Sequence, residues 1–316
     1  MAEHATRLRS LDFIVIFILA AAIVALCLLW ASGSSGPNAP VAAGNVSVHF
    51  IDVGQGDSIL VRAGDKNMLV DGGRRDAGPR LSSYLKSQGV ASIDVLVSTH
   101  PHADHIGGLL TILKEFPVKR VVDSGIAHPS QTYESYLTLI DQQNIPYTVG
   151  EAGQAIDLAP GVKVEVLAPP AARNSGGVNE NSIVLKVTSG GVSFLLMGDA
   201  GIPEEMQLMS SGYDLKSDVY KVPHHGSPFS SSVSFISKVR PEVSVIEVGQ
   251  NNYGHPAPGA LAVLEDAGSI VYRTDLNGNV VVTTDGNSFT VTPQYATPSS
   301  GELLCARANS GMRCSA

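Results

Sequence analysis

A short segment near residue 100 carries a high density of metal-ligating side chains. It reads Thr-His-Pro-His-Ala-Asp-His-Ile-Gly-Gly over residues 99–108 and directly follows an apolar run typical of a buried strand. Imidazole nitrogens and carboxylate oxygens are the donors that zinc and related divalent cations prefer. Alternating and then adjacent donors can direct two side chains at each of two neighbouring ions. The segment therefore predicts a site for two divalent cations, zinc or manganese, with four ligands: His100, His102, Asp104 and His105.

Further candidate residues follow other strand-like segments. Asp199 ends the apolar run Phe-Leu-Leu-Met-Gly-Asp, a natural position for a carboxylate that bridges two cations. His255, in Asn-Tyr-Gly-His-Pro, could complete the second ion. His224 and His225 follow a strand in Val-Pro-His-His-Gly-Ser, from which a general acid could reach the leaving oxygen. We favour His225 as that catalytic group and expect one of the pair to be a hydrogen-bonded structural histidine.

The elements that must position these residues alternate between strand-like and helix-like patterns. Predicted strands cover residues 46–50, 58–62, 68–70, 94–98, 120–123, 162–167, 182–187, 193–197, 219–222 and 243–248, and predicted helices cover residues 80–88, 109–115, 133–143 and 203–210. Helices and strands alternate in both halves, which indicates the α/β (α+β) class. The pattern favours a four-layer αββα sandwich whose strand-end loops gather at one edge.

These motifs resemble those of the metallo-β-lactamase superfamily, whose characteristic sequence is Thr-His-Pro-His-Ala-Asp-His. Val-Asp-Gly-Gly, with Asp71, is similar to the first, structural aspartate of that superfamily. Four further segments resemble the soluble hydrolase domain of ComEC-type DNA-uptake channels: Asp-Val-Gly-Gln-Gly-Asp at 52–57, Val-Pro-His-His-Gly-Ser at 222–227, Gly-His-Pro at 254–256 and Arg-Thr-Asp-Leu-Asn-Gly at 273–278. The resemblance covers about residues 45–292, which we take as the hydrolase domain.

The resemblance implies a ligand set for each ion and a reaction. One bridging carboxylate would serve both ions, with His100, His102 and Asp199 at the first and Asp104, His105, Asp199 and His255 at the second. Such a pair of cations supplies a hydroxide near neutral pH and stabilises charge on a phosphoryl or carbonyl oxygen. Asp104 would also orient that nucleophile. The implied activity is phosphodiester cleavage, with single-stranded DNA as the substrate.

One histidine of the usual superfamily pattern is missing before the bridging aspartate. In that interval only His128 occurs, and it comes too early in a loop to replace it. Asn181 stands where the ligand is expected, which makes it a candidate weak ligand or phosphate contact and would favour manganese at the first site. Ser227 and Asp57 are further candidates for substrate binding. For Asp57 and Gln55, backbone hydrogen bonding within a glycine-rich turn is an equal alternative.

The N-terminal residues differ in composition from the rest. Residues 13–31 are uncharged and mostly apolar, and nineteen residues at about 1.5 Å each span roughly 28 Å, close to the thickness of a hydrocarbon core. Arg7 and Arg9 precede this run and place residues 1–12 in the cytoplasm. We therefore expect a single-pass signal anchor at the cell membrane, a flexible linker at 32–44 and an extracytoplasmic domain. Cleavage near residues 31–33 would instead give a secreted protein.

Charge and cysteine content limit the partners. With 21 Lys and Arg against 29 Asp and Glu, the net charge is -8, so the chain has no generic nucleic-acid-binding surface. A polyanionic substrate would need the metals and a local patch; Arg74 and Arg75 could provide one, although a solvated loop accounts for them better. Residues 293–316 form a predicted tail in which Cys305 and Cys314 would pair in an oxidising compartment or stay free.

Two alternative functions remain open at this stage. The same metals could hydrolyse a small phosphodiester, ester or lactone, which the acidic domain would accommodate more readily than DNA. The chain could also be a non-catalytic binding module that works with DNA-uptake machinery. Metal content and turnover of DNA and of a generic phosphodiester distinguish these functions.

Overall fold

The computed structural model describes residues 45–173, 176–296, 303–308 and 311–315. The cytoplasmic segment predicted at 1–12, the anchor at 13–31 and the linker at 32–44 lie outside these ranges. Within the described ranges, no helix combines the length and the apolar character needed to cross a bilayer.

The described strands form two sheets. The larger sheet has the spatial order β16 (Gly311–Ser315), β15 (Leu303–Ala308), β14 (Ser288–Pro293), β13 (Val280–Thr284), β1 (Val46–Phe50), β2 (Ile59–Ala63), β3 (Lys66–Val70), β4 (Val95–Ser98), β5 (Val121–Asp123) and β6 (Tyr147–Val149). The smaller sheet has the order β12 (Ile270–Arg273), β11 (Val243–Ile246), β10 (Val219–Lys221), β9 (Val192–Leu196), β8 (Val184–Ser189) and β7 (Val162–Ala168).

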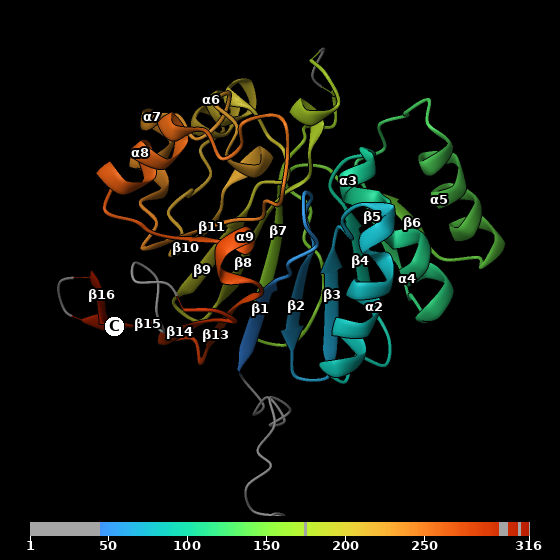
Figure 1. Cartoon of the computed structure of the whole chain (residues 1–316), viewed down its shortest axis with the longest axis horizontal. Coiled ribbons are helices and arrows are strands. Elements are labelled where there is room, and N and C mark those ends of the chain that lie inside the picture. The colour runs from blue at the N-terminus through green and yellow to red at the C-terminus, as the bar shows by residue number, and fades with distance from the viewer. Residues whose placement is uncertain (1–44, 174–175, 297–302, 309–310, 316) are drawn as a thin grey trace, which may run out of the picture. The chain divides into compact units, whose positions relative to one another are not determined.

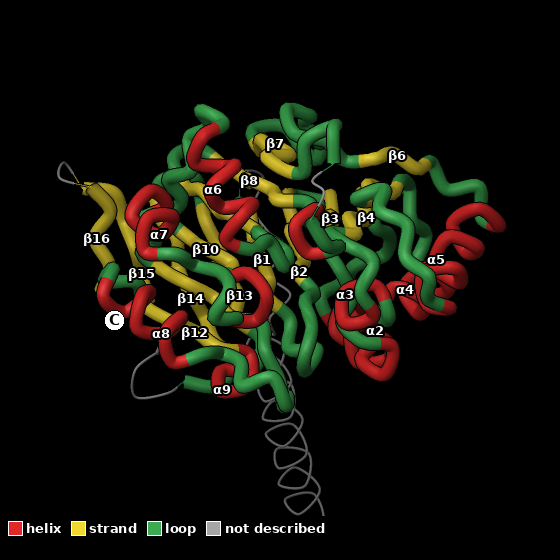
Figure 2. The backbone as a smooth tube through the Cα atoms, turned by 90° about the horizontal axis from the view of Figure 1, so that it is seen from above, coloured by secondary structure: helices red, strands yellow, loops and turns green. Residues whose placement is uncertain are grey.

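Helices cover the outer face of each sheet. Those on the larger sheet are α2 (Gly78–Ser87), α3 (Ala103–Ile106), α4 (Leu109–Glu115) and α5 (Gln131–Gln142), and those on the smaller sheet are α6 (Ile202–Ser210), α7 (Val233–Val239) and α8 (Pro258–Asp266). Figures 1 and 2 show the two groups of helices on opposite sides of the strands. Short helical turns are η1 (Arg75–Ala77), η2 (Asn179–Asn181), η3 (Pro223–Gly226) and α9 (Thr274–Asn277).

The strands are apolar on both faces because both faces are covered. Val46, Val48 and Phe50 of β1 point into the core between the sheets. Leu60 of β2 and Leu69 of β3 point the other way, into the core beneath α2, α4 and α5. Each such side chain contributes about 1.5–3 kcal/mol through burial. The arrangement of the described elements confirms the four-layer αββα sandwich.

The sheets do not coincide with the two halves of the sequence. β13, which comes late in the chain, pairs antiparallel with β1, so that Phe50 is opposite Val280 and Val46 is opposite Thr284. Strands β15 and β16 then extend the same sheet within residues 293–316, where the sequence pattern predicts only a tail. In their register, Cys305 lies directly opposite Cys314. The disulfide itself stays a prediction.

Parallel pairing brings the loops of the site together. β3, β4 and β5 are parallel in the larger sheet, as are β9, β10 and β11 in the smaller one. Parallel strands end at the same edge of a sheet, and the loops that leave their carboxyl ends therefore meet. β2 runs antiparallel to β3, so the segment that precedes β2 reaches the same edge. The predicted histidine and aspartate ligands and the catalytic residues lie in one of these loops or in the segment after β11, and Asn181 lies in the segment before β8.

Candidate metal centre

Asp71 holds the loop that carries the ligands. It follows β3 with a φ of 58°, in the left-handed region that non-glycine residues rarely adopt. Its Oδ1 accepts a hydrogen bond from the Thr99 backbone N–H at 2.8 Å, and its Oδ2 contacts Thr99 Oγ1 at 2.6 Å and His105 Nδ1 at 2.8 Å. With Nδ1 engaged, His105 presents Nε2 to the centre. This is the structural role that the sequence predicts for Asp71.

A glycine permits the close approach of a second loop. Gly56 has a φ of 140°, and a Cβ at this position would lie 2.2 Å from the backbone oxygen of Asp104. The backbone N–H of Asp57 donates to that same oxygen at 3.2 Å. The Gly-Gln-Gly-Asp turn therefore packs directly against the ligand loop, and any larger residue than glycine would displace it.

One cluster of donor atoms has the dimensions of a metal site. The ligand atoms of Asp104, His105 and His225 lie within 4.8 Å of one another. His225 Nε2 is 3.5 Å from Asp104 Oδ2, and His105 Nε2 is 3.3 Å from Asp199 Oδ1. Two ligands bound to one zinc at about 2.1 Å in tetrahedral geometry are roughly 3.4 Å apart. The measured separations match that spacing.

A second cluster shares His105 with the first, because the ligand atoms of His100, His105 and Asp199 also lie within 4.8 Å of one another. His100 Nε2 lies 3.0 Å from His102 Nδ1 and 3.8 Å from Asp199 Oδ2. The other oxygen of Asp199 faces His105 at 3.3 Å. Asp199 Oδ2 also lies 3.8 Å from Nε2 of His224 and of His225, so this one carboxylate lies among imidazoles from several loops. Divalent cations fit this donor set, and the assignment of His100, His102 and Asp199 to a first ion stays a prediction.

Unsatisfied atoms and charges also indicate cations here. His105 Nε2 faces Asp199 Oδ1 at 3.3 Å and His225 Nε2 faces Asp104 Oδ2 at 3.5 Å, but these buried nitrogens and Asp199 Oδ1 make no hydrogen bond of good geometry. Burial alone would lower the pKa of His225, but the Asp199, Asp104 and Asp57 carboxylates raise it to about 10. Burial would raise the pKa of Asp199, yet His105 and His225 hold it well below its usual range. The buried carboxylates therefore favour positive charge at the centre, and either protons on the imidazoles or bound metal ions can supply it.

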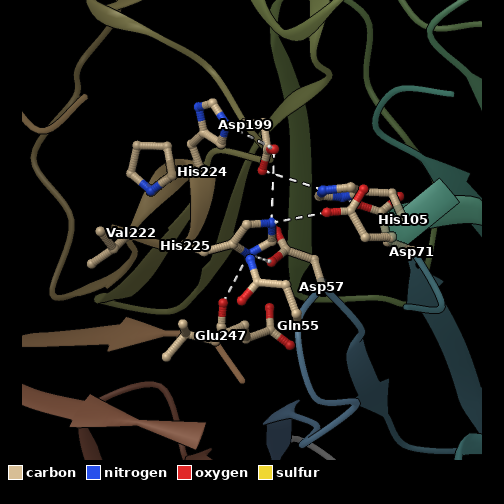
Figure 3. A network of polar contacts seen from close by, with 12 residues as sticks. Gln55, Asp57, Asp71, His105, Asp199, Val222, His224, His225 and Glu247 are labelled. Carbon is tan, nitrogen blue, oxygen red and sulfur yellow. Dashed lines mark hydrogen bonds and ion pairs between the residues drawn. The ribbon is translucent and has the colours of Figure 1, made fainter. Parts of the chain in front are cut away.

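Figure 3 shows His225 between Asp199 on one side and Asp57 and Glu247 on the other. Its Nδ1 lies 2.9 Å from the backbone oxygen of Glu247 and 3.2 Å from Asp57 Oδ1. His225 also has a φ of 55°, a strained conformation that persists only where the surroundings impose it. These contacts fix the ring so that Nε2 faces the donor cluster.

A buried charge network lies behind His225. Lys221 Nζ is 2.8 Å from Asp57 Oδ2 and donates to the backbone oxygen of Val222 at 2.8 Å. Burial raises the pKa of Glu247 well above its usual range, and the nearby Asp57 carboxylate adds to this. Burial would also raise the pKa of Asp57, but Lys221 and His225 hold it below its usual value. One buried cation therefore neutralises one carboxylate, and Asp57 supports the centre instead of lining its surface.

The remaining histidines take positions that differ from the predicted roles. Neither His255 nor His102 belongs to a donor cluster found among the described residues; the ring of His255 lies 5.6 Å from that of His224. His225 does belong to such clusters, which makes it a candidate ligand beside the predicted His255, whose role stays a prediction. His224 keeps 30% of its side chain exposed, with Nε2 3.8 Å from Asp199 Oδ2. Since His225 is buried among ligands, the geometry favours His224 as the general acid.

The predicted substrate contacts are only partly at the centre. Asn181 is buried and its Nδ2 donates to the backbone oxygen of Gly177 at 3.0 Å. Its neighbour Ser182 lies closer to the ligands, because Ser182 Oγ accepts from the Asp199 N–H at 3.2 Å and is 3.5 Å from His100 Nδ1. Ser227 Oγ accepts from the backbone N–H of Phe229 at 3.2 Å, which stabilises the loop after η3. The ligand role of Asn181 stays a prediction.

Sequence reasoning missed three residues. His128 follows β5 and its ring lies 5.5 Å from that of His102. Its position after a strand parallel to β4 was the available signal. Lys221 and Glu247 were detectable as lone charges in the apolar runs Val-Tyr-Lys-Val and Val-Ile-Glu-Val, because a charge in a buried strand must be neutralised or paired.

Layered sheets with imidazole and carboxylate clusters at one edge define a metal-dependent hydrolase of the metallo-β-lactamase type. Residues 51–249 match the Metallo-beta-lactamase superfamily, and the chain belongs to it. It is 31% identical over 281 residues to ComE operon protein 3 of Bacillus subtilis, covering 82% of this chain and 36% of that protein. It is 32% identical over 242 residues to competence protein ComA of Neisseria gonorrhoeae, and the match covers 75% of this chain and 32% of that protein.

A third relative is recombination protein 2 of Haemophilus influenzae, 30% identical over 241 residues, which are 74% of this chain and 28% of that protein. The chain thus spans about a third of the length of the curated relatives it matches. Among solved structures, the metallo-beta-lactamase fold protein YhfI of Bacillus subtilis aligns with a TM-score of 0.52 at 11% identity, covering 76% of this chain and all of that one (100%). This likeness supports the fold alone.

Proposed function

We propose that this chain is a binuclear metal-dependent phosphodiesterase that cleaves DNA outside the cytoplasm, attached to the membrane through residues 13–31. The observation that carries the proposal is the position of the Asp199 carboxylate among imidazoles from several loops: its Oδ1 is 3.3 Å from His105 and its Oδ2 is 3.8 Å from His100 and from His225. A hydrolase that uses two cations needs one such shared carboxylate. DNA is the proposed substrate because relatives of the matched region are named for competence and recombination.

The residues of the centre divide the work of hydrolysis. Two divalent cations held there would lower the pKa of a water molecule and offset charge on a phosphoryl oxygen. Asp104, whose side chain is 30% exposed, accepts a proton from the attacking water and orients it. His224 Nε2, at the exposed side of Asp199, donates a proton to the leaving oxygen. Asp71 and Asp57 keep His105 and His225 in the orientation that this division requires.

Metal replacement combined with a nuclease assay tests the proposal. The full-length protein, stripped with a chelator, should regain cleavage of single-stranded DNA when manganese or zinc is added. His102→Ala should lose bound metal and at least a hundredfold in rate, because His102 is a first-ion ligand without a role elsewhere in the fold. His4→Ala is the matched control, since His4 lies outside the hydrolase domain.

The other outcomes identify the alternatives. Cleavage that survives His102→Ala contradicts the two-cation assignment. Metal-dependent hydrolysis of bis(p-nitrophenyl) phosphate without cleavage of DNA indicates a small substrate. If the protein binds no metal and turns over neither substrate but does bind DNA, the function is that of a binding module.

A further inference from the structure

An open cleft leads away from the candidate metal centre. Asp104 lines a cavity of about 630 Å³ together with Arg74, Arg75 and Tyr253. An adjoining cavity of about 570 Å³ shares Arg74 with the first and continues to Arg80. The linings of the two cavities share Gln55, Arg74 and Asp76, so the cavities form one continuous groove. The cleft has the extent needed by an elongated substrate.

Three arginines line the cleft beside the carboxylates of Asp76 and Asp104, in a chain whose net charge is -8. Arg74, Arg75 and Arg80 are exposed. Arg74 Nε is 3.5 Å from Asp76 Oδ1, and Arg80 Nη2 is 3.6 Å from Asp52 Oδ1. Such exposed ion pairs contribute little to stability, so another anion can readily replace the carboxylate. Guanidinium groups match phosphate geometry in two hydrogen bonds. A phosphate chain that leaves Asp104 would therefore meet arginines along this wall.

An aromatic side chain stands at the rim of the same cleft. Tyr253 is 75% exposed, and its ring contacts only the ring of His255 among the aromatic pairs of the described residues, at 5.7 Å between centroids. Its loop is nevertheless tied down by Asn251, whose Oδ1 accepts from the N–H groups of Tyr253 and His255 at 3.0 and 3.1 Å. Asn251 Nδ2 also donates to the backbone oxygens of Gly249 and His255 at 2.9 and 2.8 Å. The ring is thus presented to solvent on a constrained loop, ready to stack.

We propose that this cleft is a binding site for single-stranded polynucleotide, in which Arg74 and Arg75 contact phosphates and Tyr253 stacks on a base. The inference rests on the proposed function, since it supplies the substrate track that leads to Asp104. Alternating phosphate contacts and aromatic stacking are the physical basis of single-strand binding. A base can stack on a side chain only when it is unpaired, so the site selects single strands over duplex.

Binding of a fluorescent single-stranded oligonucleotide with a nuclease-resistant phosphorothioate backbone tests this site in the metal-loaded, full-length protein. Arg74→Glu/Arg75→Glu should weaken binding at least tenfold and reduce the slope of log affinity against log salt by about 1.4, the value for two phosphate contacts. Tyr253→Ala should weaken binding roughly tenfold, whereas Tyr253→Phe, which keeps the ring, should bind like the wild type.

A charge-matched control separates the site from the overall field of the protein. Lys216 and Lys238 are exposed and lie near the start of β10, whereas the site lies at the other end of this strand. Lys216→Glu/Lys238→Glu should therefore leave the affinity for the oligonucleotide nearly unchanged. Equal losses in the two charge-reversal variants, or wild-type affinity in Tyr253→Ala, overturn the proposal. Binding without cleavage of ordinary DNA would instead overturn the proposed function and leave this site standing.

Discussion

Lys221→Met should destabilise the fold by about 3–5 kcal/mol, because it removes the nearer of the two cations that contact the buried Asp57 carboxylate and leaves only His225, 3.2 Å away. Lys221 and Asp57 have side chains that are 0% and 2% exposed, and their charged atoms are 2.8 Å apart. Methionine has a similar length, so the loss reflects charge more than volume. The Asp57 carboxylate would also keep the carboxyl group of Glu247 near it in the same buried space.

Urea unfolding of the chelator-treated protein at neutral pH measures this effect as a change in unfolding free energy. Asp57→Asn/Lys221→Met removes the orphaned charge, so we expect a loss smaller than the sum of the two single changes, with a coupling of about 0.5–3 kcal/mol. Lys163→Met is the surface control: Lys163 pairs with Glu165 at 2.7 Å but is 65% exposed, and its loss should cost about 0.5 kcal/mol or less. A cost for Lys221→Met no larger than for Lys163→Met refutes the reasoning.

Three further predictions concern other parts of the domain. Burial and Arg62 lower the pKa of His49 from 6.5 to about 3. The unfolding free energy should therefore fall by about 1.4 kcal/mol per pH unit as the pH drops from 6.5 toward 3. Urea titrations should show a smaller dependence of this free energy on pH in His49→Gln, and equal slopes in the variant and the wild type would contradict the prediction. Gly56→Ala should lower the unfolding free energy by about 2–4 kcal/mol through its clash at the ligand loop, whereas Gly64→Ala, with open space around it, should cost only about 1–2 kcal/mol; equal costs would show that the contact is not tight. His224→Gln should lower kcat on DNA about 10²- to 10⁴-fold with metal content unchanged, and a parallel loss of metal would assign His224 to the ligands instead.

The sequence predicted the layered fold well where pattern and burial agree. Apolar runs such as residues 94–98 and 193–197 are strands covered on both faces, and their length and composition suffice to identify them. The strand β13 was not predicted, and its pairing with β1 was not predictable, because strands far apart in the chain leave no periodic signal of their contact. The strands β15 and β16 were missed because small and polar residues interrupt their apolar pattern.

The candidate site shows the same division between local and long-range information. The ligands within residues 99–105 are local in sequence, so their type and spacing sufficed to place them together. The choice between His225 and His255 depended on backbone conformation: the left-handed turn at η3 directs His225 inward, while His255 lies beside His224. The contact of Lys221 with Asp57 could be predicted only from the register of β10 against its neighbouring strands, which sequence periodicity does not specify.

Metal stoichiometry of two histidine variants tests the central claim most directly. The account predicts two divalent cations in the wild-type protein, two in His255→Ala and one in His225→Ala, measured by elemental analysis after dialysis against a low concentration of free manganese or zinc. Loss of one cation from His255→Ala, with both retained in His225→Ala, would contradict the assignment of His225 to the second ion.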